Sequence, residues 1–113
     1  NNGITFCQGC FSEMGVDVPE TIRHAGEQDK IFFAHFRNIK GTVPSFHETF
    51  HDEGDTDMFA ALKAYCDAGF DGPMRPDHYP AMEGEALREW HVKGRLFAVG
   101  YVKGLLEGVQ KAS

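Results

Sequence analysis

The sequence lacks the long apolar run that a membrane-spanning helix requires, roughly 18 consecutive residues. Its first residues, Asn1 to Gly3, do not resemble a signal peptide. It also lacks an excess of positive charge, since 11 Lys and Arg against 17 Asp and Glu give a net charge of −6. We therefore expect neither a membrane nor a nucleic acid among its partners.

Cysteine is scarce as well. Three cysteines form an odd set, which argues against a disulfide framework and favours a reducing compartment, so we expect a cytoplasmic protein. Hydrophobic residues make up 42% and charged residues 25% of the 113 positions, as in an ordinary globular domain. The chain starts without Met and enters a strand-like run almost at once, so we expect a piece of a longer protein.

Three short apolar runs predict β-strands at residues 4–6, 30–36 and 70–75. The second run is almost wholly apolar, as expected for a parallel strand that is covered on both faces. Residues 37–54 form a long connection interrupted by glycine and proline. Connections of this length in compact domains are usually functional.

Helix-like segments follow the apolar runs. The first is expected to begin at a cap on Asp17 and to end at Gly26. The second is expected to follow a cap at Asp55 or Asp57 and to end at Gly69. Its predicted apolar face consists of Met58, Leu62, Tyr65 and Cys66. The last helix follows an acidic loop and repeats its apolar residues at Phe97, Tyr101 and Leu105.

This alternation predicts the fold class. The order β-α-β-α-β-α, with about 35 to 40 residues per unit, is typical of right-handed parallel βα units. Three units leave two open sheet edges, whereas a closed barrel needs eight units and about 250 residues. We therefore predict an α/β fold in which the chain forms the last three βα units of a (β/α)8 TIM barrel. Residues 1–113 are then the C-terminal fragment of a single barrel domain.

Three side chains with metal-binding chemistry stand at the ends of the expected strands: Cys7, His35 and Asp77. The carboxyl ends of parallel strands meet on one side of a barrel, so a thiolate, an imidazole and a carboxylate there predict a metal site. A thiolate favours a borderline metal over Mg²⁺ or Ca²⁺. One alternative is a core histidine at position 35. At Cys7 and Cys10, which form a CxxC, the alternatives are two buried structural thiols, a redox pair or a zinc knuckle, but the last two would need a redox context or a second CxxC that the sequence does not contain.

Arg75 and His78 flank Asp77 around Pro76. In the functional interpretation, Arg75 grips a substrate carboxylate and His78 transfers protons near neutral pH. The alternative is a salt-bridged strand end. In the long connection, His47 belongs either to a lid over the site or to one turn of helix with a polar face, together with the nearby His51.

Several segments resemble, in order, the C-terminal part of the mannonate dehydratase family. They are Phe6 to Gly9, Phe33 to Ile39, His47 to His51 with Asp55, Asp57 and Met58, Arg75 to His78, and Gly94 to Ala98. The resemblance covers essentially the whole chain. It implies a xylose-isomerase-like (β/α)8 barrel that removes water from D-mannonate to give 2-dehydro-3-deoxy-D-gluconate in hexuronate breakdown.

The resemblance also implies a site. The family uses Mn²⁺ or Fe²⁺ held by two His, a Cys and an Asp, so Cys7, His35 and Asp77 supply three ligands and an earlier strand the other His. The implied catalytic residues are His78, Arg75 and Tyr79. Family members carry a Tyr in the connection before the last helix. The nearest equivalent in this sequence is Glu89-Trp90, which has no phenol, so Tyr79 is the expected substitute. The implied substrate-binding residues are Arg37, Asn38 and His51.

Two other functions remain open from the sequence. One is a related metal-dependent sugar isomerase or epimerase that uses the same ligands. The other is a small non-catalytic zinc-binding module built on Cys7, Cys10, His47 and His51. We expect the full-length protein to be a homo-oligomer, and we expect the chain by itself to be incomplete for activity.

Overall fold

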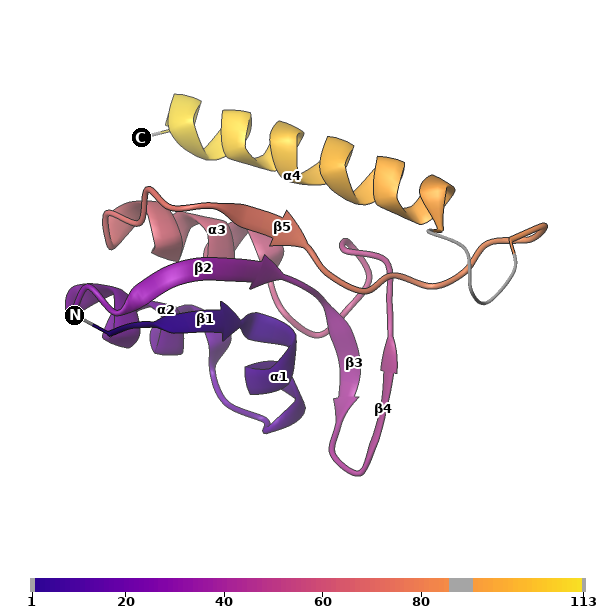
Figure 1. The fold of residues 1–113 in the computed structure, drawn as a ribbon, viewed down its shortest axis with the longest axis horizontal. Coiled ribbons are helices and arrows are strands. Elements are labelled where there is room, and N and C mark those ends of the chain that lie inside the picture. The colour runs from indigo at the N-terminus through magenta and orange to yellow at the C-terminus, as the bar shows by residue number, and fades with distance from the viewer. Residues whose placement is uncertain (1, 86–90, 113) are drawn as a thin grey trace.

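The computed structural model of the chain describes residues 2–85 and 91–112. Figure 1 shows a small parallel sheet with helices behind and above it and a separate hairpin at one end. The elements in chain order are β1 (Ile4–Cys7), α1 (Gln8–Glu13), α2 (Val18–Glu27), β2 (Ile31–Phe36), β3 (Ile39–Thr42), β4 (Ser45–Glu48), α3 (Met58–Asp67), β5 (Met74–Pro76) and α4 (Val92–Ala112).

The parallel sheet has the strand order β1-β2-β5, and all its strands run in the same direction. Figure 1 shows the three arrowheads at the end of the sheet that is next to α1 and the β3–β4 hairpin. The register pairs Cys7 with His35, and His35 with Arg75. The carboxyl ends of the three strands therefore meet, as the sequence predicts for consecutive βα units.

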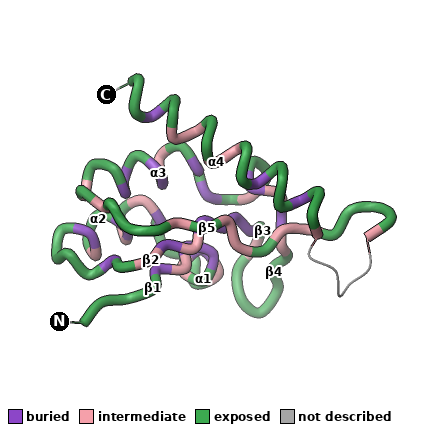
Figure 2. Tube along the Cα trace, turned by 45° about the horizontal axis from the view of Figure 1, so that its top comes forward, coloured by how far each residue is buried: buried purple, intermediate pink, exposed green. Residues whose placement is uncertain are grey.

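The core lies between the sheet and the helices. Phe6 of β1 stacks on Phe11 with ring centroids 4.5 Å apart, and it meets the ring of Tyr65 edge-on. Figure 2 shows buried positions along the sheet and on the helices behind it. The apolar side chains of this core include Phe6, Ile22, Phe36, Leu62, Tyr65 and Val109. Apolar burial of this kind is the main favourable contribution to folding.

Both predicted helix starts are confirmed. The Asp17 carboxylate accepts a hydrogen bond from the Glu20 backbone N–H at 3.0 Å, and Asp57 accepts one from Ala60 at 2.9 Å. These bonds satisfy backbone donors that the first turn of a helix leaves free. Gly69 follows α3 with a φ of +77°, in the left-handed conformation common just after a helix.

The predicted end of the first helix at Gly26 is wrong, because α2 continues to Glu27. A Cβ added at Gly26 would lie 2.4 Å from the Cβ of Ala68, beside the end of α3. Glycine here allows α2 and α3 to approach closely. Cys66, predicted on the apolar face of α3, is exposed.

The strands also depart from the sequence prediction. Strand β5 is confined to Met74–Pro76 instead of residues 70–75. Two elements were not predicted: the helix α1 and the β3–β4 hairpin inside the long connection. Strand β2 is covered fully on only one face, since Ala34 and Phe36 are buried whereas Phe33 and His35, which alternate with them, are only partly buried.

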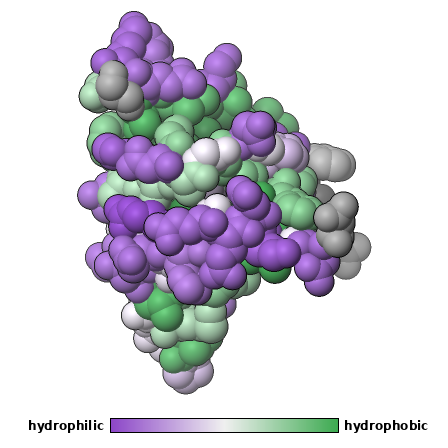
Figure 3. Space-filling model, turned by 90° about the vertical axis from the view of Figure 1, so that its left-hand side faces the viewer, coloured by the Kyte–Doolittle hydropathy of each residue, from purple (hydrophilic) through white to green (hydrophobic). Residues whose placement is uncertain are grey.

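The surface is mixed in character. In the part of the chain that the structure describes, no helix has the length and apolar character to cross a lipid bilayer. Figure 3 shows the left-hand end of the molecule in Figure 1. A hydrophilic band crosses the middle of this face, and hydrophobic surface lies between that band and the hydrophilic top. A cleft of about 490 Å³ between α3, β5 and α4 is lined mainly by apolar side chains, such as Leu62, Phe70 and Val102.

Candidate metal centre

Cys7, His35 and Asp77 lie together at the carboxyl ends of β1, β2 and β5. One ligand atom from each of these residues lies within 4.8 Å of the other two. Among the residues that the structure describes, this is the one group of three or more His, Cys, Asp or Glu side chains with such spacing. All three residues are partly buried, so they are accessible from one side.

The sheet register produces this convergence. Cys7 and His35 are direct partners across β1 and β2. The Asp77 backbone N–H donates to the carbonyl of Phe36 at 3.3 Å, which continues the β2–β5 pairing one residue beyond β5. Three parallel strands of the same direction thus deliver a sulfur, an imidazole and a carboxylate to one end of the sheet.

Asp77 is the centre of the charged groups at this end. Its Oδ2 lies 3.4 Å from Nδ1 of His35 and 3.6 Å from Nε2 of His78. Its Oδ1 lies 3.7 Å from Nη2 of Arg75. The Asp77 side chain is 13% exposed, whereas those of Arg75 and His78 are 57% and 58% exposed. Arg75 and His78 can therefore reach a molecule that approaches the carboxylate from solvent.

His78 lies between two acidic residues. It has a φ of +53°, which few residues other than glycine adopt. Its Nδ1 is 3.9 Å from Oε1 of Glu48, and its Nε2 faces Asp77. Glu48 ends β4, so the unpredicted hairpin brings a further carboxylate to the site.

Arg37 is buried next to the site and contacts Glu13 and Glu48 instead of pointing into solvent. Its side chain is 7% exposed and forms ion pairs with Glu13 at 3.0 Å and, through two nitrogens, with both carboxylate oxygens of Glu48. Its Nη1 also lies 4.0 Å from the sulfur of Cys7 and 3.7 Å from that of Cys10. Burial acts to lower the pKa of Arg37, but the hydrogen bond and charge of Glu48, followed by those of Cys7, raise it above its ordinary value.

Asn38 and His51 are also held inside the chain. The Asn38 amide donates to the backbone carbonyls of His51 and Thr56, and its oxygen accepts from the Thr56 N–H. His51 is fully buried, and its Nε2 donates to the carbonyl of Phe36 at 2.6 Å. Burial lowers the pKa of His51, against the opposing effects of that carbonyl and nearby acidic groups.

These contacts change the interpretation of the three expected substrate-binding residues. Arg37, Asn38 and His51 are 6%, 1% and 0% exposed. The structure places them beneath the strand ends, where they fix the loop after β2, and not at an open surface. Direct contact with a substrate stays a prediction for them, whereas their supporting contacts are observed.

Tyr79 is directed toward α4. Its hydroxyl accepts a hydrogen bond from Nε of Arg95 at 2.9 Å, and its ring meets that of His91. Its expected catalytic role stays a prediction. The predicted equivalence of a family Tyr with Glu89-Trp90 lies outside the described residues.

The zinc module built on Cys7, Cys10, His47 and His51 is not found. His47 is exposed on β4, where it pairs with Lys40 across the hairpin, and His51 is fully buried. The helical turn considered for this segment is also wrong, because residues 45–48 form a strand. Among the described residues, neither His47, His51 nor Cys10 joins a group with metal-ligand spacing.

Two residues near the site were not predicted. Glu48 anchors Arg37 and faces His78, and Gln8 is buried with its amide bonded to the Arg37 carbonyl at 3.1 Å and to the Tyr65 hydroxyl at 3.0 Å. Burial raises the pKa of Tyr65. The sequence offers one signal for Gln8, namely a polar residue directly after an apolar strand. A buried amide in such a place needs hydrogen-bond partners.

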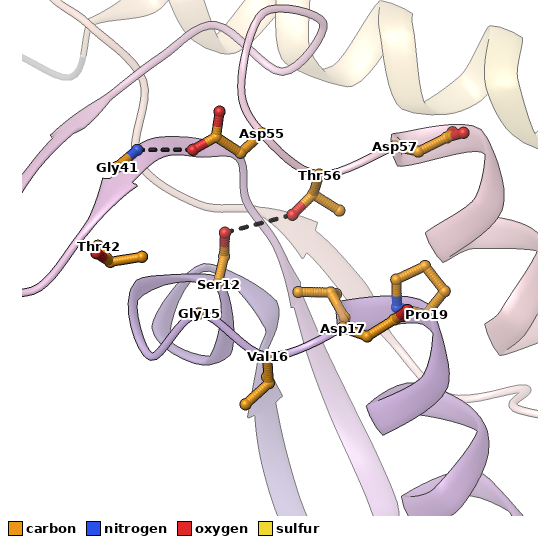
Figure 4. A pocket seen from close by; sticks show the side chains of 11 residues that line it. Ser12, Gly15, Val16, Asp17, Pro19, Gly41, Thr42, Asp55, Thr56 and Asp57 are labelled. Atoms are coloured by element: carbon orange, nitrogen blue, oxygen red, sulfur yellow. Dashed lines mark hydrogen bonds between the residues drawn. The ribbon is translucent and has the colours of Figure 1, made fainter.

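A separate cavity of about 400 Å³ lies between the α1–α2 connection, the hairpin and the start of α3 (Figure 4). Three of its lining residues are acidic, but Asp17 and Asp57 cap helices and Asp55 accepts the Gly41 N–H at 2.7 Å. Figure 4 also shows the Ser12 and Thr56 hydroxyls facing each other. Its carboxylates thus have structural partners, and none of the three candidate metal ligands lines it.

A parallel βα sheet with three potential metal ligands at its strand ends is typical of α/β proteins of the TIM-barrel type, here with a candidate metal centre. Comparison with known proteins agrees with this class. The family model described as D-mannonate dehydratase (UxuA) matches residues 1–113. The chain therefore belongs to the mannonate dehydratase family.

Individual relatives support the family. The chain is 46% identical to mannonate dehydratase 2 of Halalkalibacterium halodurans, over 96% of this chain and 33% of that protein. It is 42% identical to the mannonate dehydratase of Brachyspira hyodysenteriae, over 97% of this chain and 32% of that protein. The chain thus spans about a third of the length of the relatives that it matches.

Solved structures show the same fold. The crystal structure of mannonate dehydratase from Streptococcus suis serotype 2 matches with a TM-score of 0.88 and 31% identity, over 97% of this chain and 33% of that chain. A structure of L-ribulose 3-epimerase matches with a TM-score of 0.70 and 17% identity, over 97% and 38% of the two chains. The second match shows the fold alone. The predicted position in the last three units of a barrel is not confirmed by these matches.

Proposed function

We propose that this chain forms the metal-binding part of a D-mannonate dehydratase. The enzyme removes water from D-mannonate and releases 2-dehydro-3-deoxy-D-gluconate. The observation that carries the proposal is the convergence of Cys7, His35 and Asp77 within 4.8 Å of one another. Membership of the family supports it, because several relatives carry the name mannonate dehydratase.

The three side chains fit a first-row divalent cation. A sulfur, an imidazole nitrogen and a carboxylate oxygen together suit a borderline metal and disfavour Mg²⁺ or Ca²⁺. We assign Mn²⁺ or Fe²⁺, with Cys7, His35 and Asp77 as the ligands from this chain. When bound, the cation supplies a Lewis acid for a substrate carboxylate and the oxygen beside it.

The chain's own residues supply the remaining chemistry. Dehydration breaks the bond between carbon 2 and its hydrogen and the bond between carbon 3 and its hydroxyl oxygen. The hydroxyl leaves as water after it gains a proton, and the resulting enol becomes the 2-keto acid by gaining a proton at carbon 3. His78 is exposed next to Asp77 and transfers a proton in this sequence. Arg75, also exposed, binds the substrate carboxylate.

The position of the chain in the barrel is part of the proposal. We place it as the last three units of a (β/α)8 barrel, within a cytoplasmic, homo-oligomeric protein. Two features support an incomplete barrel: β1 and β5 are both edge strands, and Phe32 of β2 is 53% exposed. The coding sequence on either side of residues 1 and 113 tests this position. If the other five units follow residue 113, the chain forms the first units instead.

The proposed metal centre is tested by titrating the reduced chain with Co²⁺ as a spectroscopic probe. We expect a sulfur-to-metal absorption band that Cys7→Ser abolishes and that Cys66→Ser leaves unchanged. Cys66 is a matched control because it is exposed on α3 and outside the ligand group. A band that persists in Cys7→Ser would contradict the assignment of this ligand.

The proposed reaction is tested with the complete protein. We expect Mn²⁺- or Fe²⁺-dependent formation of the keto-deoxy acid from D-mannonate, and no isomer or epimer of a neutral ketose. Release of an epimer with no loss of water would favour the epimerase alternative. Metal-dependent turnover of another hexonate in preference to D-mannonate would support the proposed dehydration but would contradict the proposed substrate.

A further inference from the structure

Cys7 and Cys10 lie one turn apart at the amino end of α1. Cys7 is the N-cap residue, with an extended backbone (φ −95°, ψ 98°), and Cys10 follows in the first turn. Both sulfurs lie within 4.0 Å of Nη1 of Arg37. Both cysteines are free, and Cys10 is exposed. We propose that this pair is a dithiol site which hydroperoxides oxidise to an intramolecular Cys7–Cys10 disulfide.

The local geometry suits that bond. Residues three apart in an α-helix have Cα atoms about 5 Å apart, given a rise of about 1.5 Å per residue and a Cα radius of about 2.3 Å. A disulfide joins Cα atoms separated by roughly 4.4–6.8 Å, so this spacing suits it. The two sulfurs also share one neighbour, since Nη1 of Arg37 lies 4.0 Å from Cys7 Sγ and 3.7 Å from Cys10 Sγ. Both sulfurs therefore point to the same side of α1.

Arg37 is fixed in this position. Glu13 and Glu48 hold its guanidinium, so the positive charge stays beside the two sulfurs. Gly9, between the two cysteines, leaves room for the arginine, because a Cβ at Gly9 would lie 2.3 Å from Cδ of Arg37. A nearby cation of this kind is a common feature of reactive cysteines.

The reaction is balanced by the peroxide. The two thiols lose two protons and two electrons and form one sulfur–sulfur bond. The oxygen–oxygen bond of the hydroperoxide breaks, and its two oxygen atoms take up these protons and electrons. An organic hydroperoxide is thereby converted to one alcohol and one water, and hydrogen peroxide to two waters. The first step forms a sulfenic acid on one sulfur, and the second thiol displaces its hydroxyl as water.

The disulfide competes with the metal centre for one sulfur. The sulfur of Cys7 belongs to the ligand group with His35 and Asp77. A disulfide sulfur has no negative charge to offer a metal, so oxidation removes one of the three ligands. This consequence rests on the proposed function, whereas formation of the disulfide does not.

Cys10 is suited to the role of second thiol. It lies outside the ligand group. Because Cys10 is exposed, its thiol is accessible for attack on a sulfenic acid formed on Cys7.

Thiol counting tests the disulfide. The reduced chain is treated with a small excess of hydrogen peroxide, alkylated with iodoacetamide and weighed by mass spectrometry, with the complete protein measured in parallel. We expect two of the three cysteines to escape alkylation, a cross-linked Cys7–Cys10 peptide, and full recovery with dithiothreitol. Cys66→Ser should behave like the wild type, whereas Cys10→Ser should form no intramolecular disulfide.

Three results would overturn the dithiol site: all cysteines remain open to alkylation, the cross-link involves Cys66, or Cys7 passes to a sulfinic acid while Cys10 stays reduced. The link to the metal has its own readout. We expect Co²⁺ affinity to fall at least about tenfold on oxidation, and prior Co²⁺ loading to slow disulfide formation. A cross-link that forms without change in Co²⁺ affinity would overturn that link and the ligand role of Cys7, and would leave the disulfide standing.

Discussion

Asp77 connects the residues with proposed roles. Its carboxylate is within 3.4–3.7 Å of charged or chargeable groups on His35, Arg75 and His78. Because His35 is mostly buried and the other two are exposed, the same carboxylate faces the sheet on one side and solvent on the other. The proposed metal ligand Asp77 can therefore contact His35 on the sheet side while His78, on the solvent side, remains available for proton transfer.

Substitutions at His78 and Arg75 should separate these roles in the complete protein. Asn suits position 78 because it tolerates the left-handed backbone, and His78→Asn should lower kcat by about 10²- to 10⁴-fold with metal content unchanged. Arg75→Ala should mainly raise KM for D-mannonate, by about tenfold or more. Steady-state kinetics and metal analysis check both variants. Loss of metal in His78→Asn would show that His78 is a ligand.

His51 makes folding sensitive to pH. Its ring is fully buried, and burial lowers its pKa below the ordinary 6.5. The folded chain therefore resists protonation of His51, whereas the unfolded chain accepts a proton at the ordinary pKa. Stability from the neutral ring is present above pH 6.5 and is lost as the pH falls below it.

The corresponding prediction concerns the thermal midpoint. The wild-type chain should lose thermal stability when the pH falls from above to below 6.5, and His51→Gln should lose less over the same interval. His24→Gln is the control, since His24 is exposed on α2. Equal pH dependence in the wild type and His51→Gln, measured by circular dichroism, would show that another group causes the effect.

At the scale of elements, the sequence predicted the parts with strong local signals. Asp17, Asp57 and Gly69 mark helix ends because caps are local. The convergence of Cys7, His35 and Asp77 was predicted from strand order, because the carboxyl ends of parallel strands share one side. Helix α1 was missed because its six residues bury Gln8, Gly9 and Ser12 in place of an apolar stripe.

The residues that support the site were harder to predict. The β3–β4 hairpin is mostly exposed, so alternation of apolar and polar residues is absent there. The pairing of Arg37 with Glu13 and Glu48 depends on that hairpin and on α1 together. Such contacts join three elements, and no local pattern in the sequence encodes them.

Two glycine substitutions test the packing of helices. Gly9→Ala places a Cβ 2.3 Å from Arg37, whose far end is held by two carboxylates, so we expect a loss of about 1–3 kcal/mol in unfolding free energy. Gly108→Ala meets no atom within 4 Å on α4 and should add about 0.5–1 kcal/mol. Urea unfolding measures both changes. A stabilised Gly9→Ala variant would mean that Arg37 moves freely.

At the scale of the whole molecule, the sheet is open. Both β1 and β5 have one unpaired side in the three-stranded sheet. Strand β2 exposes Phe32 at 53%, and α4 exposes Val92 and Leu96 at 66% and 74%. Unpaired strand edges and exposed apolar side chains favour association with other chains. In a closed barrel, neighbouring units cover these surfaces.

The last prediction is that residues 1–113 by themselves are not an active dehydratase. The chain supplies three candidate ligands within 4.8 Å of one another. The family resemblance implies a fourth ligand, a His from an earlier strand, and its absence weakens a first-row metal site. Its open edges should also make it self-associate, which size-exclusion chromatography with light scattering would detect. The assay adds Mn²⁺ or Fe²⁺ and D-mannonate to the purified chain and measures the keto-deoxy acid. Turnover near that of a full-length relative such as the Halalkalibacterium halodurans enzyme would contradict the argument, and would require the missing ligand to come from a second copy of the chain.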